Sequence, residues 1–136
     1  MRLYYLIWVD CIQKIRGQPT NKNNWRLLCM IFMTVPMSID FIFIMTVLQN
    51  FILGNNFYKL DIELLPAEIN KPLSFVIRFI MPWIVINYLL IFINCKYEKL
   101  IKKYSYHNGT WFITFLAVSI FGPLIIIWVW VLTRSQ

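Results

Sequence analysis

The sequence predicts an all-α integral membrane protein with three transmembrane helices and an N-terminal amphipathic helix at the membrane interface. Composition is the first observation, since 60% of the 136 residues are apolar, 14% are charged and the mean hydropathy is +0.63. Soluble domains carry about 25% charged and 45–50% apolar residues, so this balance excludes an ordinary soluble enzyme and a disordered tail. The other two observations are three long apolar stretches and a net charge of +7 whose basic residues gather in two short segments.

Three stretches are long enough to cross a bilayer, namely 27–48, 73–93 and 111–132. At about 1.5 Å per residue each reaches about 31–33 Å, which matches a hydrocarbon core of about 30 Å. Lipid offers no partner for unpaired backbone groups, so these stretches are expected to be helices. The whole chain, 1–136, is therefore expected to form a single membrane domain.

The segment 1–16 contains an apolar stretch that is too short to span a membrane. Asp10, Gln13 and Lys14 share one helical face and mostly apolar residues fill the rest, a pattern that favours an amphipathic helix lying in the interface. A re-entrant segment and a cleaved signal peptide are the alternatives. The latter is disfavoured because a single arginine precedes the apolar residues and no small-residue cleavage motif follows them. The aromatic residues expected at headgroup level are Tyr4, Tyr5 and Trp8.

Lysine and arginine set the expected orientation, because cytoplasmic loops carry an excess of them. The segment before the first span and the inner loop at 94–110 together hold nine, whereas the outer loop at 49–72 and the C-terminal tail hold three. We therefore expect a cytoplasmic N-terminus and an external C-terminus. Frequent Lys, Asn, Ile and Phe are typical of an AT-rich genome, most simply a bacterial one, so the expected location is a bacterial inner membrane. The basic residues expected to contact anionic lipid are Lys96, Lys99, Lys102 and Lys103.

Two charged residues, Asp40 and Arg78, fall inside the predicted spans. A lone charge in the hydrocarbon costs a few kcal/mol or more, so each is expected to have a partner. In antiparallel neighbouring spans Asp40 would lie about 12 Å and Arg78 about 8 Å from the outer ends, and we expect them to pair. The pair could fix helix register, Asp40 could titrate or bind a cation beside Arg78, or either could pair with another chain. Further hydrogen-bond partners for such a pair would be Thr34, Ser38 and Asn87.

Each predicted span holds one proline near its middle: Pro36, Pro82 and Pro123. Proline removes a backbone hydrogen bond and kinks a helix. Three kinks at similar depth predict a shaped core with a hinge or cavity, although proline is also generally frequent in membrane helices.

The outer loop contains a strand-like alternation over residues 58–64, flanked by turn residues. We expect a short β-strand that pairs with a strand of a partner protein or of another copy. The alternative is an extended segment whose apolar side rests on the membrane or on the spans. The expected contact residues are Tyr58, Leu60, Ile62 and Leu64.

The sequence offers little for catalysis or metal binding. His107 is the single histidine, no serine stands in a Gly-x-Ser-x-Gly turn, and no glycine-rich phosphate loop occurs. The cysteines lack a Cys-x-x-Cys spacing and are expected to be reduced structural thiols, namely Cys11, Cys29 and Cys95. We therefore expect no enzyme activity, no cofactor, no metal and no nucleic-acid partner.

The expected function is that of a non-catalytic small subunit of a multi-protein inner-membrane complex. Three kinked helices bury little surface alone, so neighbours from other subunits or other copies are expected to complete the packing. A homo-oligomeric channel or membrane-disrupting effector with Asp40 near its pore is a second possibility, and a small transporter is a third.

Overall fold

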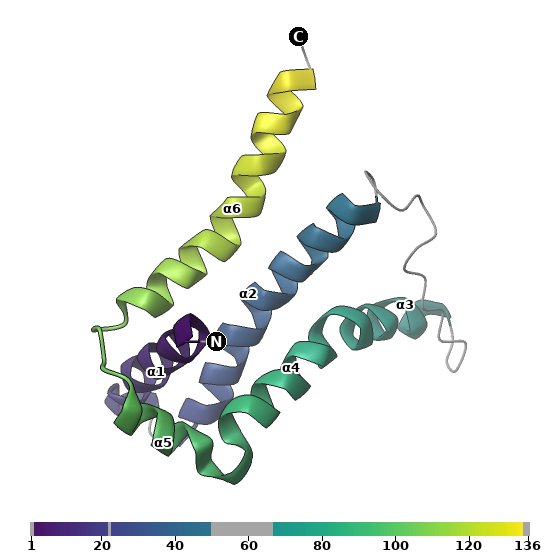
Figure 1. Ribbon diagram of the computed structural model, residues 1–136. Coiled ribbons are helices and arrows are strands. Elements are labelled where there is room, and N and C mark those ends of the chain that lie inside the picture. The colour runs from purple at the N-terminus through teal and green to yellow at the C-terminus, as the bar shows by residue number, and fades with distance from the viewer. Residues whose placement is uncertain (1, 22, 50–66, 135–136) are drawn as a thin grey trace.

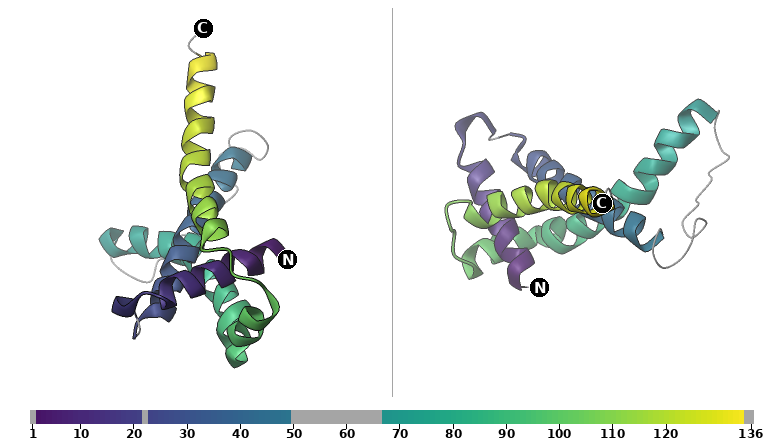
Figure 2. Two further views of the ribbon diagram at one scale, coloured as in Figure 1. Left: turned by 90° about the vertical axis from the view of Figure 1, so that its left-hand side faces the viewer. Right: turned by 90° about the horizontal axis from the view of Figure 1, so that it is seen from above.

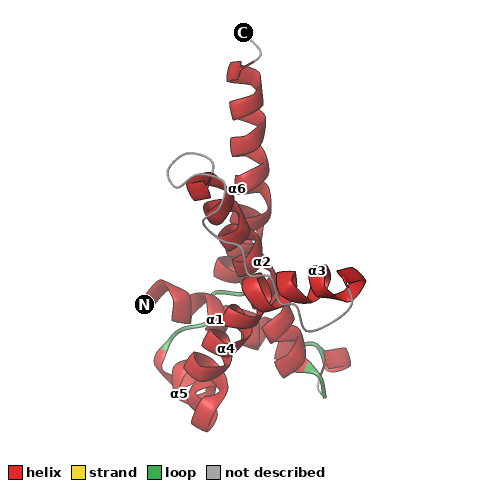
Figure 3. Ribbon diagram, turned by 90° about the vertical axis from the view of Figure 1, so that its right-hand side faces the viewer, coloured by secondary structure: helices red, strands yellow, loops and turns green. Residues whose placement is uncertain are grey.

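The computed structural model describes residues 2–21, 23–49 and 67–134, and in these ranges all the regular secondary structure is helical (Figure 3). Three helices are long and apolar enough to cross a membrane: Trp25–Leu48, Asn70–Lys103 and Thr110–Thr133. They contain the three predicted spans, so the all-α class and the number of candidate membrane helices are confirmed. The expected strand at 58–64 lies outside the described residues.

Helix α1 (Arg2–Arg16) is embedded in the protein, at the end of the bundle where α2 (Trp25–Leu48) begins (Figure 1). It packs against α2, α5 (Lys96–Lys103) and α6 (Thr110–Arg134). Its five central residues, from Trp8 to Ile12, are each 0% exposed. Five consecutive residues cover every side of a helix, so protein surrounds this part of α1.

This burial corrects two expectations about the N-terminal helix. Trp8 packs edge-on against Phe92, with 5.6 Å between the ring centroids, and is therefore covered by protein rather than exposed to lipid headgroups. Asp10, which was assigned to a polar face beside Gln13 and Lys14, is fully buried. A helical wheel shows which residues share a face, but it does not show whether water or protein donors meet that face.

The second span is not a uniform α-helix. It runs through α3 (Ala67–Phe75), the π-helix η3 (Val76–Ile80), α4 (Met81–Asn87) and the π-helix η4 (Tyr88–Phe92). Pro82 lacks the N–H that would bond to the carbonyl four residues earlier, and the preceding N–H, that of Met81, bonds to the Val76 carbonyl instead. This wider turn lies where α3 turns away from the axis of α4 (Figure 1).

The other two prolines lie inside continuous α-helix, Pro36 within α2 and Pro123 within α6. Of the three positions expected to kink, Pro82 is the one that directly follows a π-helical segment, η3. Two short 3₁₀ helices, each a single turn, occur at the connections. They are η1 (Pro19–Asn21), between α1 and α2, and η5 (Ile93–Cys95), at the end of the second span.

The second span ends where the chain adopts left-handed backbone angles. Asn94 and Cys95 have φ values of 52° and 53°, and α5 begins at the next residue. Because an α-helix cannot continue through such angles, α5 takes a new direction. Helix α5 in the inner loop is therefore separate from the helical part of the second span.

The hydrophobic core gathers around α1 rather than along the spans. Trp8, Ile12, Cys29, Met33 and Ile91 are all completely buried there. In contrast, the most apolar windows of the three candidate spans are 28%, 11% and 6% buried, in chain order. Figure 2 shows α6 extending from this packed end with its C-terminal part well away from the other helices. One end of the bundle is thus tightly packed, and the rest presents apolar side chains outward.

Replacing Trp8 by alanine tests this uneven packing. The Trp8→Ala substitution should lower the free energy of unfolding by about 3–5 kcal/mol, because it opens a cavity in the core. The matched control is Trp128→Ala, since Trp128 is 66% exposed and its loss should cost within about 0.5 kcal/mol. Both free energies can be measured by circular dichroism during denaturant titration in a mild detergent. Equal losses for the two variants would contradict a core centred on α1.

Candidate functional site

The buried carboxylate of Asp10 joins α1 to the beginning of α6. Its Oδ1 accepts a hydrogen bond from the backbone N–H of His107 at 2.8 Å, and its Oδ2 accepts one from the N–H of Trp111 at 3.0 Å. The first N–H groups of a helix have no partner within the helix and carry partial positive charge. Asp10 therefore acts as an N-terminal cap that another helix supplies, and the two buried groups satisfy each other.

The loop before α6 lies directly on α1 near this cap. Lys14 Nζ donates to the Asn108 carbonyl at 3.3 Å, and Gly109 has a φ of 81°. A Cβ at Gly109 would lie 3.0 Å from Lys14 Cδ. His107 Nδ1 lies 4.0 Å from Asp10 Oδ1, with its side chain partly exposed. These contacts hold the N-terminal end of α6 against the middle of α1.

A second buried polar contact joins three helices deeper in the bundle. Tyr4 OH donates to Asn87 Oδ1 at 2.7 Å, and Asn87 Nδ2 donates to Thr34 Oγ1 at 3.2 Å. Burial raises the pKa of Tyr4 to about 12, so its hydroxyl remains protonated and able to donate. Asn87 and Thr34 were expected to assist a charge pair, and instead they connect α4 and α2 to α1. Ser38, on α2, donates to its own helix at the Thr34 carbonyl, 2.8 Å away.

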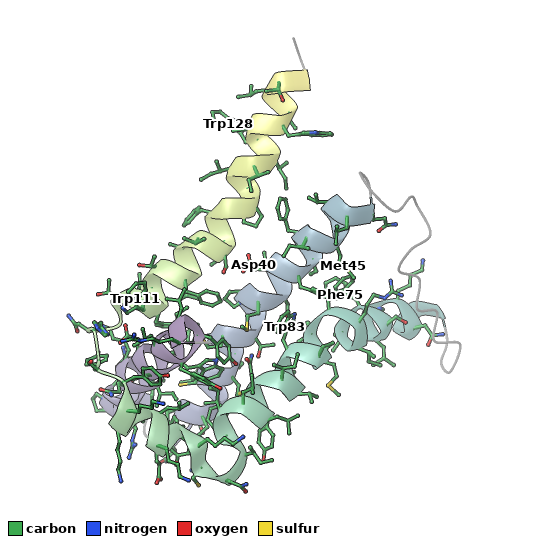
Figure 4. The ribbon with its side chains drawn as sticks, in the orientation of Figure 1. Asp40, Met45, Phe75, Trp83, Trp111 and Trp128 are labelled. Atoms are coloured by element: carbon green, nitrogen blue, oxygen red, sulfur yellow. The ribbon has the colours of Figure 1, made fainter. Side chains whose placement is uncertain are left out.

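Asp40 makes the third polar contact, between α2 and α6. Its Oδ2 accepts a hydrogen bond from Ser119 Oγ at 2.7 Å. Ser119 is buried, whereas Asp40 is only half-buried. Figure 4 shows Asp40 on α2 opposite α6, at a level well inside the apolar stretch of α2.

The expected ion pair between Asp40 and Arg78 is not formed within the described residues. Helix α2 lies between α6 on one side and η3 with α4 on the other (Figure 1). Asp40 turns towards α6, while the Arg78 guanidinium carbon lies 6.0 Å from the ring centroid of its neighbour Phe79. Counting residues along each span gave an expected depth for both residues, but it could not give the direction in which each side chain leaves its helix.

The four lysines expected to contact anionic lipid are all exposed on α5. Lys96 Nζ also donates to the Leu89 carbonyl at 3.3 Å, which ties the start of α5 to the end of the second span. The other expected contact residues, Tyr58, Leu60, Ile62 and Leu64, lie outside the described residues.

The cysteines do not form a metal centre among the described residues, where no group of three potential ligands occurs. Cys11 and Cys29 are free and buried, and Cys95 is free and exposed. Burial raises the pKa of the Cys11 thiol well above its ordinary value, and the neighbouring Cys29 thiol raises it further. The buried Cys11 thiol is thus held in the unreactive protonated form.

Comparison with known proteins adds no assignment: the chain matches no protein-family model, no curated protein and no solved structure. Its function must therefore be argued from the three interhelical polar contacts and from its charged surfaces. The sequence reasoning missed Asp10 as a functional residue. The available signal was a single acid in an otherwise apolar turn of the N-terminal helix.

The Asp10 cap predicts a specific local loss of stability. Asp10→Ala removes the acceptor of two backbone N–H groups, at a cost of about 0.5–1.5 kcal/mol for each lost hydrogen bond. Hydrogen exchange should accelerate at the amides of His107 and Trp111 before it does so in α2. Glu98→Ala is the matched control, because this exposed acid accepts only a 3.3 Å bond from Tyr97. Unchanged protection of the two amides in Asp10→Ala would show that the cap does not hold α6.

Proposed function

We propose that the chain is a non-catalytic small subunit of a membrane-protein complex, in which its apolar helices pack against helices of other chains. The observation that carries this proposal is the half-buried carboxyl group of Asp40. Within the described residues Ser119 is its only hydrogen-bond donor. Each carboxylate oxygen can accept more than one hydrogen bond, so this half-buried group retains acceptor capacity.

A carboxyl group at this depth is costly unless its hydrogen-bonding capacity is met. Lipid tails offer no donor, so the remaining partner is best supplied by a polar side chain of a neighbouring helix. This reasoning applies whether Asp40 is charged or protonated, since a protonated carboxyl group also needs partners. The exposed side of Asp40 therefore supports a contact with another chain.

The surface of α6 near this contact supports the same proposal. Gly122 stands three residues after Ser119, and a Cβ at Gly122 would meet nothing within 4 Å. Small residues let two membrane helices approach closely. An additional helix packed here would lie beside Ser119 and Asp40 and could donate to the carboxyl group.

The orientation and location follow from charge and are part of the proposal. We place the end of the bundle that contains α1 and α5 on the cytoplasmic side of a bacterial inner membrane. Nine of the basic residues lie in the segment before the first span and in the loop at 94–110, and both segments belong to this end. The C-terminus of α6 is then outside. The loop at 49–72 provides an additional contact with partner proteins through its alternating segment.

A homo-oligomeric channel is the second candidate, and the same exposed carboxyl group favours it. Several copies arranged around an axis would form a ring of Asp40 side chains, which is the kind of lining that selects cations. The two candidates differ in what surrounds Asp40. It contacts a protein donor in a subunit, and it contacts water in a channel.

The assembly proposal predicts that Asp40→Ala weakens association. A hydrogen bond to a charged group contributes about 1.5–3 kcal/mol, so the dissociation constant should rise about tenfold or more. Asp40→Asn keeps one acceptor oxygen and should cause a smaller rise. Native mass spectrometry of particles extracted in a mild detergent measures both the composition and the assembled fraction.

The matched control is Thr133→Ala, because the Thr133 hydroxyl bonds to the Trp130 carbonyl of its own helix at 2.9 Å. This variant should assemble as the unmodified chain does. A particle of identical chains that conducts cations in vesicles, and loses conductance in Asp40→Asn, would favour the channel. A purely monomeric chain in native-like lipid would overturn both candidates.

A further inference from the structure

Two guanidinium groups share one indole ring where α1 ends and α2 begins. The Arg16 Cζ lies 5.7 Å from the Trp25 ring centroid, and the Arg26 Cζ lies 5.4 Å from the same centroid. Arg26 is also 5.4 Å from the ring centroid of Tyr97, on α5, and its Nη2 donates to Tyr97 OH at 3.0 Å. Stacking on aromatic rings restricts the arginine side chains while their remaining N–H donors stay available.

These two positive charges have no directly paired acid. Within the described residues neither guanidinium forms an ion pair, and both side chains are exposed. The acid nearest along the hydrogen bonds is Glu98, which accepts from Tyr97 OH at 3.3 Å. The cluster of Arg16, Trp25 and Arg26, called the arginine cluster below, therefore carries an excess of positive charge beside a single acid.

A pocket adjoins the arginine cluster and shares Arg16 with it. It has a volume of about 320 Å³ and is lined by Gln13, Arg16, Gly17 and Ile101. The amide of Gln13 and the guanidinium of Arg16 can donate to an anion, while Ile101 offers an apolar wall. Guanidinium groups bind phosphate oxygens through two parallel N–H bonds, so the pocket and the cluster together suit a phosphate group with an attached organic moiety.

The position of the cluster indicates that the phosphate belongs to a lipid. Trp25 and Arg26 are the first two residues of α2, at the level where tryptophan and arginine commonly meet the headgroups. The next residue begins an exposed apolar stripe along the same helix, formed by Leu27, Ile31 and Val35 at intervals of four residues. Acyl chains attached to a phosphate at this level would extend along apolar surface of this kind.

We propose that the arginine cluster and its adjoining pocket bind the phosphate of an anionic phospholipid headgroup. Arg16 and Arg26 bind the phosphate oxygens, Trp25 holds both arginines in position, and Gln13 donates to the glycerol or headgroup oxygens. The site is distinct from the lysines of α5. Those lysines would attract an anionic surface through their charge, without being held together on one aromatic ring as Arg16 and Arg26 are. It does not depend on the proposed assembly, because all its residues belong to one chain.

The test uses the full-length chain and native mass spectrometry with phosphatidylglycerol and phosphatidylcholine as probes. Phosphatidylglycerol should be retained with a dissociation constant at least about tenfold lower than that of phosphatidylcholine. Arg16→Gln together with Arg26→Gln should raise the phosphatidylglycerol constant about tenfold or more, as expected for lost charge-assisted hydrogen bonds. The matched control, Lys99→Gln together with Lys102→Gln, removes the same charge and should change it less than about threefold.

Two more variants separate bidentate recognition from simple attraction. Arg26→Lys keeps the charge but loses the planar pair of donors, so the affinity for phosphatidylglycerol should fall several-fold. Glu98→Gln removes the nearby acid, so it should raise the affinity for phosphatidylglycerol. Circular dichroism establishes that each variant is folded before its affinity is compared. An unchanged affinity in Arg26→Lys, or equal losses in the double arginine and double lysine variants, would overturn the site.

Competition with inorganic phosphate distinguishes a site for a phospholipid headgroup from a site for a soluble phosphate. If the ligand is a lipid, millimolar phosphate should displace little phosphatidylglycerol, because it lacks the acyl chains. Displacement by phosphate at concentrations similar to those of the lipid would overturn the lipid assignment and indicate a site for a soluble phosphate. Native mass spectrometry resolves assembled from monomeric particles and lipid-bound from lipid-free particles. Loss of lipid binding and loss of assembly can therefore be measured independently.

Discussion

The hydrogen bonds between the Asp10 carboxylate and the start of α6 constrain the arrangement of the remaining helices. A fully buried carboxylate is tolerated only where donors satisfy it, and the donors here are backbone N–H groups of His107 and Trp111 that themselves need an acceptor. Both partners are satisfied because α1 packs against the start of α6. The core that contains Trp8 lies around the same part of α1.

This constraint also accounts for the uneven packing along the spans. In lipid there is no hydrophobic force that pulls apolar helices together, so association depends on close packing and interhelical hydrogen bonds. The interhelical polar contacts described above form four groups, centred on Asp10, Asn87, Asp40 and the hydrogen bond from Arg26 to Tyr97. Each joins a different set of helices, and among the described residues none joins α6 to another helix beyond Ser119 along its length. Figure 2 shows the C-terminal part of α6 well away from the other helices.

The three spans could be predicted because length and hydropathy alone determine which segments a bilayer accepts. The burial of α1 within the bundle could not be predicted. On a helical wheel, the position of Asp10 is equally compatible with a solvent-exposed polar face and with a buried capping residue.

The partner of Asp40 could not be predicted for a different reason. Depth follows from counting residues along a helix, but the direction of a side chain around the axis depends on how neighbouring helices pack, and that direction places Asp40 towards Ser119 instead of Arg78. The separate course of α5 depends on the φ angles of Asn94 and Cys95, which the sequence alone does not specify.

The arginine cluster and the Asp10 cap lie on the same helix, so occupation of one bears on the other. Arg16 is the last residue of α1, and Trp25 opens α2, so a headgroup bound between them would oppose separation of α1 from α2. A ligand that binds only the folded arrangement stabilises it by an amount that grows with the logarithm of its concentration. Stabilising α1 in its place stabilises the cap on α6, and α6 carries the Ser119 that orients Asp40. In the proposed assembly, binding of an anionic lipid to the arginine cluster would thereby influence how firmly the Asp40 carboxyl group is held for contact with a neighbouring chain.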